Sequence, residues 1–161
     1  MGLLIDTSVL IDAERERAGI GTLVDEFGGA FVAISSVTVS ELLLGVHRLG
    51  QLIEAATGQQ REELEAKRAR VEGFVESALL AVPVVAFDEA IARVHARVSA
   101  DLLATGTIVG QHDLIIGATA LALDFAIVTT DTRSFPKIPG LNVRPRARRT
   151  KPNPGRIKRR R

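Results

Sequence analysis

The chain of 161 residues contains no cysteine. This absence excludes a disulfide-stabilised scaffold, a zinc ribbon and a thiol nucleophile, and it fits a reducing compartment. The N-terminus lacks a basic stretch followed by an apolar core, so we expect no secretory signal. The longest apolar run, residues 114–123, is shorter than the roughly 20 residues that a membrane-spanning helix needs. We therefore expect a soluble cytoplasmic protein without membrane contact.

The composition is that of one globular domain with an uneven charge distribution. Hydrophobic residues make up 46% and charged residues 25% of the chain, and the length allows a single core. Residues 144–161 carry ten Arg or Lys and no acid, so the other 143 residues carry 11 basic and 19 acidic side chains, a net charge of −8. We predict a domain over residues 1–145 and a basic, flexible tail over residues 146–161. The tail either binds an anionic partner or is simply solvated.

Short apolar runs alternate with amphipathic stretches along the chain. The apolar runs predict strands at residues 2–5, 31–34, 82–87 and 125–129, with a short edge strand at 142–143. The amphipathic or capped stretches predict helices after Thr7 or Ser8, at 20–27, at 37–49 behind Ser35–Ser36, at 59–80, from Asp88 to about Leu102, and at 113–123. This alternation predicts an α/β fold with three layers, α/β/α, and a central, mainly parallel sheet.

Four carboxylates stand where a predicted strand ends or a helix begins. Asp6 follows the first strand, Glu41 and Asp113 lie near helix starts, and Asp131 follows the fourth long strand. The carboxyl ends of parallel strands gather at one edge of a sheet, where ligands bind. Four like charges brought together repel one another unless a cation joins them, and oxygen ligands suit Mg²⁺ or Mn²⁺. The pattern predicts metal-dependent phosphate chemistry.

Each carboxylate also has a purely structural interpretation. Asp6 could form a turn or cap a helix, and Glu41 forms a capping-box pattern with Thr38. Asp113 suits the positive end of a helix dipole, and Asp131 suits an Asx-turn. No single position decides between structure and function, so the argument depends on the four residues together.

Several neighbours of the carboxylates are candidates for supporting roles. We interpret His112 as a cap or surface residue rather than a metal ligand, and Asp12 as surface charge. Four hydroxyl side chains are candidates to orient the carboxylates by hydrogen bonds, with ordinary capping as the alternative: Thr7, Ser8, Thr129 and Thr130.

The segments around the four carboxylates resemble those of a known family. They are residues 6–11 (DTSVLI), 34–45 (ISSVTVSELLLG), 112–121 (HDLIIGATAL) and 128–135 (VTTDTRSF). In order and spacing they resemble the PIN-domain ribonucleases, in the VapC-like branch of type II toxins, over about residues 2–145. The chain departs from the family pattern at Ser134, where an acid is frequent, and at Gly117, where Ala is common.

The resemblance implies a function and partners. It implies that Asp6, Glu41, Asp113 and Asp131 hold Mg²⁺ or Mn²⁺ and cleave RNA, leaving a 5′-phosphate and a 3′-hydroxyl. It also implies a homodimer and a cognate antitoxin, one segment of which blocks the acidic groove. Residues 37–49 and 59–80 are candidate contact surfaces for that partner, although their apolar faces could instead belong to the core.

Other functions remain open at this point. The chain could be a non-catalytic RNA- or partner-binding module that uses its basic tail, or a housekeeping RNA-processing nuclease. A haloacid-dehalogenase-type phosphatase would need a second Asp where Ser8 stands, and a receiver domain would need a Lys after residues 127–128. These last two classes are therefore disfavoured.

Overall fold

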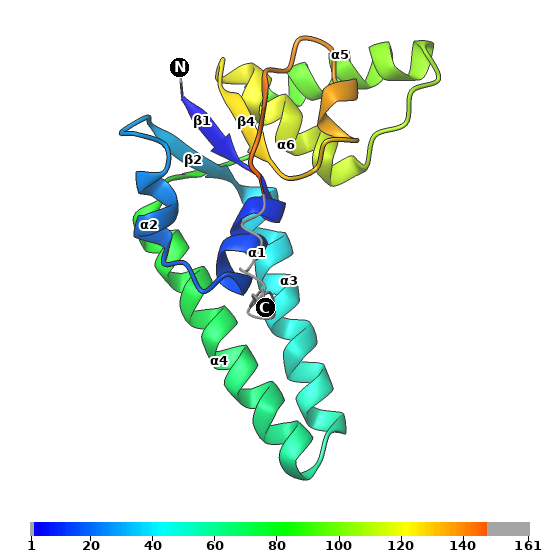
Figure 1. Cartoon of the computed structure of the whole chain (residues 1–161). Coiled ribbons are helices and arrows are strands. Elements are labelled where there is room, and N and C mark those ends of the chain that lie inside the picture. The colour runs from blue at the N-terminus through cyan, green and yellow to red at the C-terminus, as the bar shows by residue number, and fades with distance from the viewer. Residues whose placement is uncertain (1, 148–161) are drawn as a thin grey trace, which may run out of the picture.

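Figure 1 shows the computed structural model of the chain, which describes residues 2–147. Most of the predicted tail, residues 148–161, lies outside the described residues. The described strands form one sheet in the order β3-β2-β1-β4-β5, and every neighbouring pair is parallel. The strands are β1 (Leu3–Ile5), β2 (Val32–Ser35), β3 (Val84–Val85), β4 (Ala126–Thr129) and β5 (Val143–Pro145).

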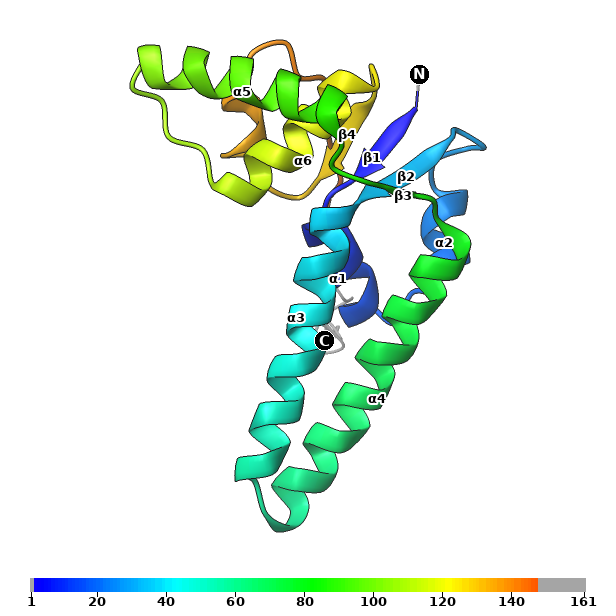
Figure 2. The same ribbon diagram turned by 180° about the vertical axis from the view of Figure 1, so that it is seen from behind.

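Helices cover both faces of the sheet. One group comprises α1 (Thr7–Arg15), α2 (Ile20–Asp25), α3 (Ser36–Ala55) and α4 (Gly58–Ala81). The other comprises α5 (Glu89–Ala104) and α6 (Gln111–Ala122), with a 3₁₀ turn, η1 (Phe135–Lys137), beside α6. Figures 1 and 2 show that α3 and α4 run antiparallel and extend beyond the sheet as a long hairpin.

Alternation along the strands divides the core into two clusters. Leu3 and Ile5 of β1 pack into the cluster formed with α1, α2, α3 and α4, whereas Leu4 between them packs into the cluster formed with α5 and α6. Successive side chains of a strand point to opposite faces, so a sheet buried on both sides needs such continuous apolar runs. The predicted three-layer α/β/α architecture is confirmed.

Some predicted boundaries are wrong for identifiable reasons. The helix predicted over residues 37–49 continues to Ala55, because α4 packs along it for most of its length. The strand predicted over residues 82–87 is reduced to two residues at the sheet edge. Pro83 has no N–H, and only its carbonyl joins the ladder, accepting from Ile34 N at 3.0 Å. The short edge strand extends to Pro145, and α6 begins at Gln111, two residues before Asp113.

The N-terminus of α1 is capped by one of the four carboxylates. Asp6, rather than Thr7 or Ser8, is the N-cap, and its carboxylate accepts a hydrogen bond from Ser8 N at 3.3 Å. The caps predicted for α3 and α5 are confirmed, with Ser35 accepting from Val37 N and Asp88 from Ile91 N, each at 3.0 Å. In residues 2–147 no helix combines the length and apolarity that crossing a membrane would require.

Candidate functional site

Asp6 is the centre of a hydrogen-bonded cluster where β1 and β4 end. Its side chain is buried, and its backbone N–H donates to Val128 O at 2.9 Å. Thr129 Oγ1 and the Ser8 hydroxyl both donate to Asp6 Oδ2, the former at 2.8 Å. Ser8 Oγ in turn accepts from Thr130 N at 3.1 Å. The parallel register thus brings residues more than 120 positions apart onto one carboxylate oxygen.

Glu41 reaches the same region from α3. The Thr7 hydroxyl donates to Glu41 Oε2, and His112 Nδ1 lies 2.8 Å from Glu41 Oε1. Glu41 therefore joins α1, α3 and α6 at the edge of the sheet. The capping-box interpretation is wrong, because Ser35 caps α3 and Thr38 Oγ1 is buried without a hydrogen-bond partner in the described part of the chain.

Asp131 forms the Asx-turn that its sequence context allows. Its Oδ1 accepts from Arg133 N at 2.8 Å and from Ser134 N at 3.3 Å, while its own N–H donates to Thr129 Oγ1 at 2.9 Å. Side-chain hydrogen bonds from Ser134 lower the pKa of both Asp113 and Asp131. Ser134 therefore influences both carboxylates. In the sequence it stands out only as a departure from the family pattern.

The pKa of Asp113 responds to burial and to the charges of the other three carboxylates. Burial is the largest cause that raises the pKa of Asp113, and the charges of Asp6, Asp131 and Glu41 each raise it further. Burial also raises the pKa of Asp6, although the hydrogen bonds from Ser8 and Thr129 oppose the shift. By contrast, the hydrogen bond from Arg133 N is the main reason that the pKa of Asp131 is lowered. The expectation that like charges gathered together raise at least one carboxylate pKa agrees with these directions.

The four carboxylates, called here the quartet, are suited to a hard cation, but they are not arranged as a complete set of metal ligands. Four carboxylates are the donor set that Mg²⁺ or Mn²⁺ prefers. Within residues 2–147, however, no three acidic or histidine side chains are already arranged to hold an ion. Both oxygens of Glu41 interact with protein groups, Thr7 and His112. Binding an ion would therefore require these side chains to turn inward and exchange hydrogen bonds.

Only some of the predicted supporting residues form the contacts expected of them. Thr7, Ser8 and Thr129 orient carboxylates as predicted, whereas Thr130 Oγ1 is buried without a hydrogen-bond partner among the described residues. His112 has a side chain that is 58% exposed, in agreement with a surface position, and it contacts Glu41. Asp12 is only 7% exposed, so its assignment to surface charge is wrong. Periodicity on a nine-residue helix could not decide which of its polar residues faces inward.

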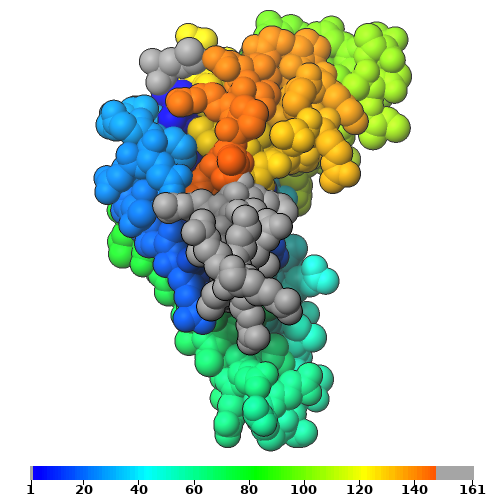
Figure 3. All heavy atoms as spheres, in the orientation of Figure 1, coloured from blue at the N-terminus to red at the C-terminus, as the bar shows by residue number. Residues whose placement is uncertain are grey.

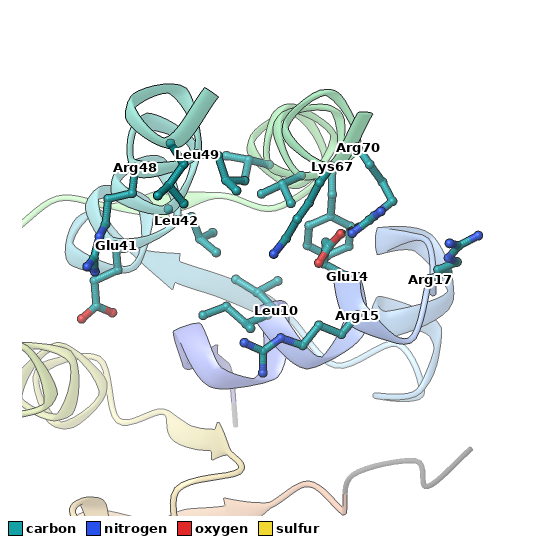
Figure 4. A pocket seen from close by; sticks show the side chains of 16 residues that line it. Leu10, Glu14, Arg15, Arg17, Glu41, Leu42, Arg48, Leu49, Lys67 and Arg70 are labelled. Atoms are coloured by element: carbon teal, nitrogen blue, oxygen red, sulfur yellow. Dashed lines mark hydrogen bonds and ion pairs between the residues drawn. The ribbon is translucent and has the colours of Figure 1, made fainter. Parts of the chain in front are cut away.

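A groove of about 580 Å³ begins at Glu41 and runs between α1, α3 and α4. Figure 4 shows Glu41 at one end of this groove and Arg17 at the other. Its floor is apolar, with Leu10, Leu42 and Leu49 among the lining residues. Its remaining charged lining residues are mainly basic and comprise Arg15, Arg48, Lys67, Arg70 and Glu14, of which the last two form an ion pair at 2.7 Å.

Comparisons with known proteins agree with this geometry. Residues 3–141 match the PIN domain family. The chain is 30% identical over 143 residues to ribonuclease VapC1 of Rickettsia felis, covering 89% of this chain and 95% of the relative. It is 31% identical over 140 residues to the tRNA(fMet)-specific endonuclease VapC of Shigella flexneri, covering 87% and 94%.

Solved structures show the same fold. The structure of VapBC2 from Rickettsia felis bound to a promoter DNA fragment matches with a TM-score of 0.68 at 19% identity, covering 91% of this chain and 100% of that one. VapBC-5 from Mycobacterium tuberculosis matches with a TM-score of 0.59 at 28% identity, covering 89% and 95%. The match to the family, the identity to VapC ribonucleases and the parallel sheet lead to one conclusion: this chain belongs to the PIN-domain family, in its VapC-like branch.

Proposed function

We propose that this protein is a Mg²⁺- or Mn²⁺-dependent endoribonuclease and the toxin of a toxin–antitoxin pair. The observation that supports this most directly is the electrostatic environment of Asp113, whose pKa is raised by burial and by the charges of Asp6, Glu41 and Asp131. A fold that needed these acids only for caps and turns would have no reason to gather all four. Relatives named as ribonucleases and endonucleases support RNA as the substrate class.

The residues divide the catalytic work as follows. Asp6, Glu41, Asp113 and Asp131 would hold the ion, which when bound lowers the pKa of a water and neutralises charge on phosphate oxygens. Thr129 and Ser8 fix the orientation of Asp6 through its Oδ2. Ser134 donates its backbone N–H to Asp131, and its hydroxyl, which has one proton, can stabilise the charge of Asp113 or of Asp131 but not of both at once. His112 and Thr7 hold Glu41 at the entrance of the site.

The groove supports the second half of the proposal, a cognate antitoxin. Its apolar floor and largely basic rim fit a peptide segment that carries both apolar and acidic side chains. Because Glu41 lies in the groove and in the carboxylate site, a segment bound there would also restrict access to the site. Solved structures with the same fold include a member of the VapBC family of toxin–antitoxin systems and a toxin–antitoxin complex, which favours an antitoxin partner here. We further propose that the protein acts in the cytoplasm as a homodimer.

The decisive experiment measures RNA cleavage by the purified protein. Total RNA is incubated with the protein in EDTA, in Mg²⁺ and in Mn²⁺, and the ends of the products are mapped. We expect cleavage only with the divalent ion, producing 5′-phosphate and 3′-hydroxyl ends. Glu41→Gln should abolish cleavage, whereas Glu54→Gln, which alters an exposed acid on the same helix, should leave it unchanged. Cleavage that survives EDTA, or that Glu41→Gln does not reduce, would refute the metal site.

A further experiment separates the toxin from a housekeeping nuclease. Expression of the chain alone should arrest growth, and co-expression of a small gene immediately upstream should relieve the arrest. Growth unaffected by an active nuclease would favour the housekeeping role. RNA binding without any metal-dependent cleavage would instead favour the non-catalytic binding module.

A further inference from the structure

Arg146, the residue after strand β5, is joined to the carboxylate site through its backbone. Strand β5 pairs with β4 in parallel, with Pro145 opposite Thr129, and Arg146 N donates to Thr129 O at 2.8 Å. Thr129 in turn holds two members of the quartet. Its hydroxyl donates to Asp6 Oδ2 at 2.8 Å and accepts from Asp131 N at 2.9 Å. A contact that fixes Arg146 therefore also helps to fix the residue that links Asp6 to Asp131.

The side chain of Arg146 is held by two acids at helix ends. Arg146 Nε and Nη2 donate to the two carboxylate oxygens of Glu26 at 3.0 and 3.1 Å, and Nη2 also lies 3.3 Å from Glu16 Oε2. The Arg146 side chain is 7% exposed, and the two acids are the C-cap residues of α1 and α2. A guanidinium can meet both carboxylates because its N–H donors have a fixed planar arrangement that an ammonium lacks. Figure 3 shows the orange-red end of the described chain against the blue N-terminal helices.

The end of α1 that carries Glu16 has a defined backbone geometry of its own. Arg17 N donates to Glu14 O at 3.0 Å and Ala18 N to Ala13 O at 2.9 Å, which are the two hydrogen bonds of a Schellman motif. Arg17 has a φ of 58°, the left-handed conformation that this motif usually gives to glycine. The backbone at Glu16 is therefore held by the helix end itself, and Glu16 is a firm attachment point for Arg146.

These contacts close a ring that begins and ends at Asp6. Asp6 is the N-cap of α1, and this helix of nine residues, about 13 Å long, leads to its C-cap Glu16. The ion pair joins Glu16 to Arg146, and the backbone hydrogen bond leads on to Thr129, whose hydroxyl returns to the starting carboxylate. Arg146 follows a strand two positions away from β1, about 10 Å at the usual strand spacing, so the ring fixes α1 against the edge of the sheet. Glu26 holds the same guanidinium but belongs to α2, so it lies outside the ring.

We propose that Arg146 is a positioning residue of the nuclease, which closes this ring by pairing with Glu16 and so keeps Thr129 and Asp6 in the alignment that cleavage needs. The inference rests on the proposed nuclease function. The guanidinium of Arg146 is held by Glu16 and Glu26, so Arg146 acts through Thr129 and not by contact with the substrate. The rival interpretation is that the ion pairs only stabilise the fold. Because a misplacement of about 1 Å can slow an enzyme about a hundredfold, the two interpretations predict different kinetics.

The two acids provide a matched pair of substitutions in the full chain. Glu16→Ala opens the ring, whereas Glu26→Ala removes the bidentate pair and leaves the ring closed. Kinetics are measured with Mg²⁺ and a labelled RNA fragment that contains a cleavage site mapped in total RNA, well below both melting temperatures. Glu26→Ala should lower the melting temperature more, yet leave kcat within about twofold, whereas Glu16→Ala should lower kcat at least about fivefold with KM within about twofold. Losses of kcat that merely follow the losses of melting temperature would overturn the positioning role.

A double-mutant cycle tests whether Arg146 acts through Thr129. Arg146→Gln should lower kcat at least about fivefold in the otherwise unsubstituted chain, but less than about twofold in the Thr129→Val chain, where the link to Asp6 is already missing. Arg146→Lys should restore only part of kcat, because an ammonium lacks the planar fork. Arg144→Gln, an exposed neighbour on β5 with the same loss of charge, should leave kcat within about twofold in both chains. Independent, multiplicative effects of Arg146→Gln and Thr129→Val would overturn the proposal.

Hydrogen exchange tests the ring without RNA or metal. The Asp131 N–H donates to Thr129 Oγ1, so its exchange rate in NMR spectra reports how firmly Thr129 is held. Glu16→Ala should speed this exchange at least about fivefold more than Glu26→Ala does, although Glu26→Ala is the less stable variant. Unchanged exchange in Glu16→Ala would overturn the ring. If exchange responds as expected but no variant cleaves RNA, the nuclease assignment fails while the ring between α1 and β5 stands.

Discussion

Thr129 and Asp6, 123 residues apart in the sequence, are joined by a hydrogen bond of 2.8 Å from Oγ1 to Oδ2. Thr129 is fully buried, and the same hydroxyl accepts from Asp131 N at 2.9 Å. One side chain thus links two carboxylate residues that follow neighbouring strands. The geometry of the site therefore depends on the pairing of β1 with β4.

Thr129→Val should disrupt this link with almost no change in shape. The substitution removes the hydrogen bond that Asp131 N donates and one of the hydrogen bonds that Asp6 Oδ2 accepts. We therefore expect a destabilisation of about 1–3 kcal/mol and at least tenfold slower cleavage. Urea unfolding and RNA cleavage measure the two effects. Thr119→Val is the control, because that buried hydroxyl donates only to Ile115 O within α6. Equal losses of activity in both variants would contradict the role given to Thr129.

Asp6→Asn should separate stability from activity. Burial raises the pKa of Asp6, so its charged form is unfavourable in the metal-free fold. Asn can still cap α1 and accept from Ser8 and Thr129. We expect cleavage to be lost while the melting temperature in EDTA rises by about 2–4 °C, the shift that about 1 kcal/mol produces in a chain of this size. A lower melting temperature would show that Asp6 stabilises the fold as a charged cap.

Asp113 and Asp131 should affect stability with opposite dependence on pH. The folded-state pKa of Asp113 is raised, so the folded state binds more protons than the unfolded state and stability falls as pH rises from 3.8 through that pKa. The folded-state pKa of Asp131 is lowered, so its contribution is present above 3.8 and is lost as pH falls through the folded-state pKa.

Urea midpoints of the metal-free protein between pH 3 and pH 7 measure this contrast. Asp113→Asn should become more stable relative to the unsubstituted chain as pH rises, and Asp131→Asn should become less stable. Both differences should shrink at the acidic end, where the carboxylates are protonated. Parallel pH profiles for the two variants would contradict the assigned environments.

A divalent ion should stabilise the protein through the same carboxylates. An ion that binds only the folded state adds about 2.7 kcal/mol at one hundred times its dissociation constant. The melting temperature should therefore rise with Mg²⁺ or Mn²⁺, and the rise should disappear in Asp113→Asn. Asp101→Asn, which changes an exposed acid on α5, should keep the full rise. An equal rise in both variants would indicate a non-specific salt effect.

Gly117 tests the packing of α6 against the segment after β4. A Cβ at this buried glycine would come within 2.5 Å of Ile138 Cδ1. Gly117→Ala gains about 1 kcal/mol of helix propensity but forces Ile138 to move, so its net effect should be small. Combined with Ile138→Val, which removes the obstructing methyl group, it should be more stable than the two single effects predict, by about 0.5–2 kcal/mol. Simple additivity in urea unfolding would contradict the contact.

The sequence by itself determined the layers, and it marked the four acids as candidate site residues. Short apolar runs such as Gly2–Ile5 and residues 125–129 favour strands buried on both faces, and parallel strands place Asp6 and Asp131 at one edge. Local chemistry also identified the caps at Ser35 and Asp88, because capping depends on residues within three positions of each other.

The tertiary structure alone decided what these residues contact. The His112–Glu41 pair and the ion pairs of Arg146 with Glu16 and Glu26 join residues that are far apart in the sequence. It also revealed that Asp12 is buried. Within residues 2–147, it showed in addition that the quartet is not arranged as a complete set of metal ligands. Periodicity specifies which face of an element is apolar, whereas the meeting of polar side chains depends on strand order, register and helix packing. Those relations exist only once the chain has folded.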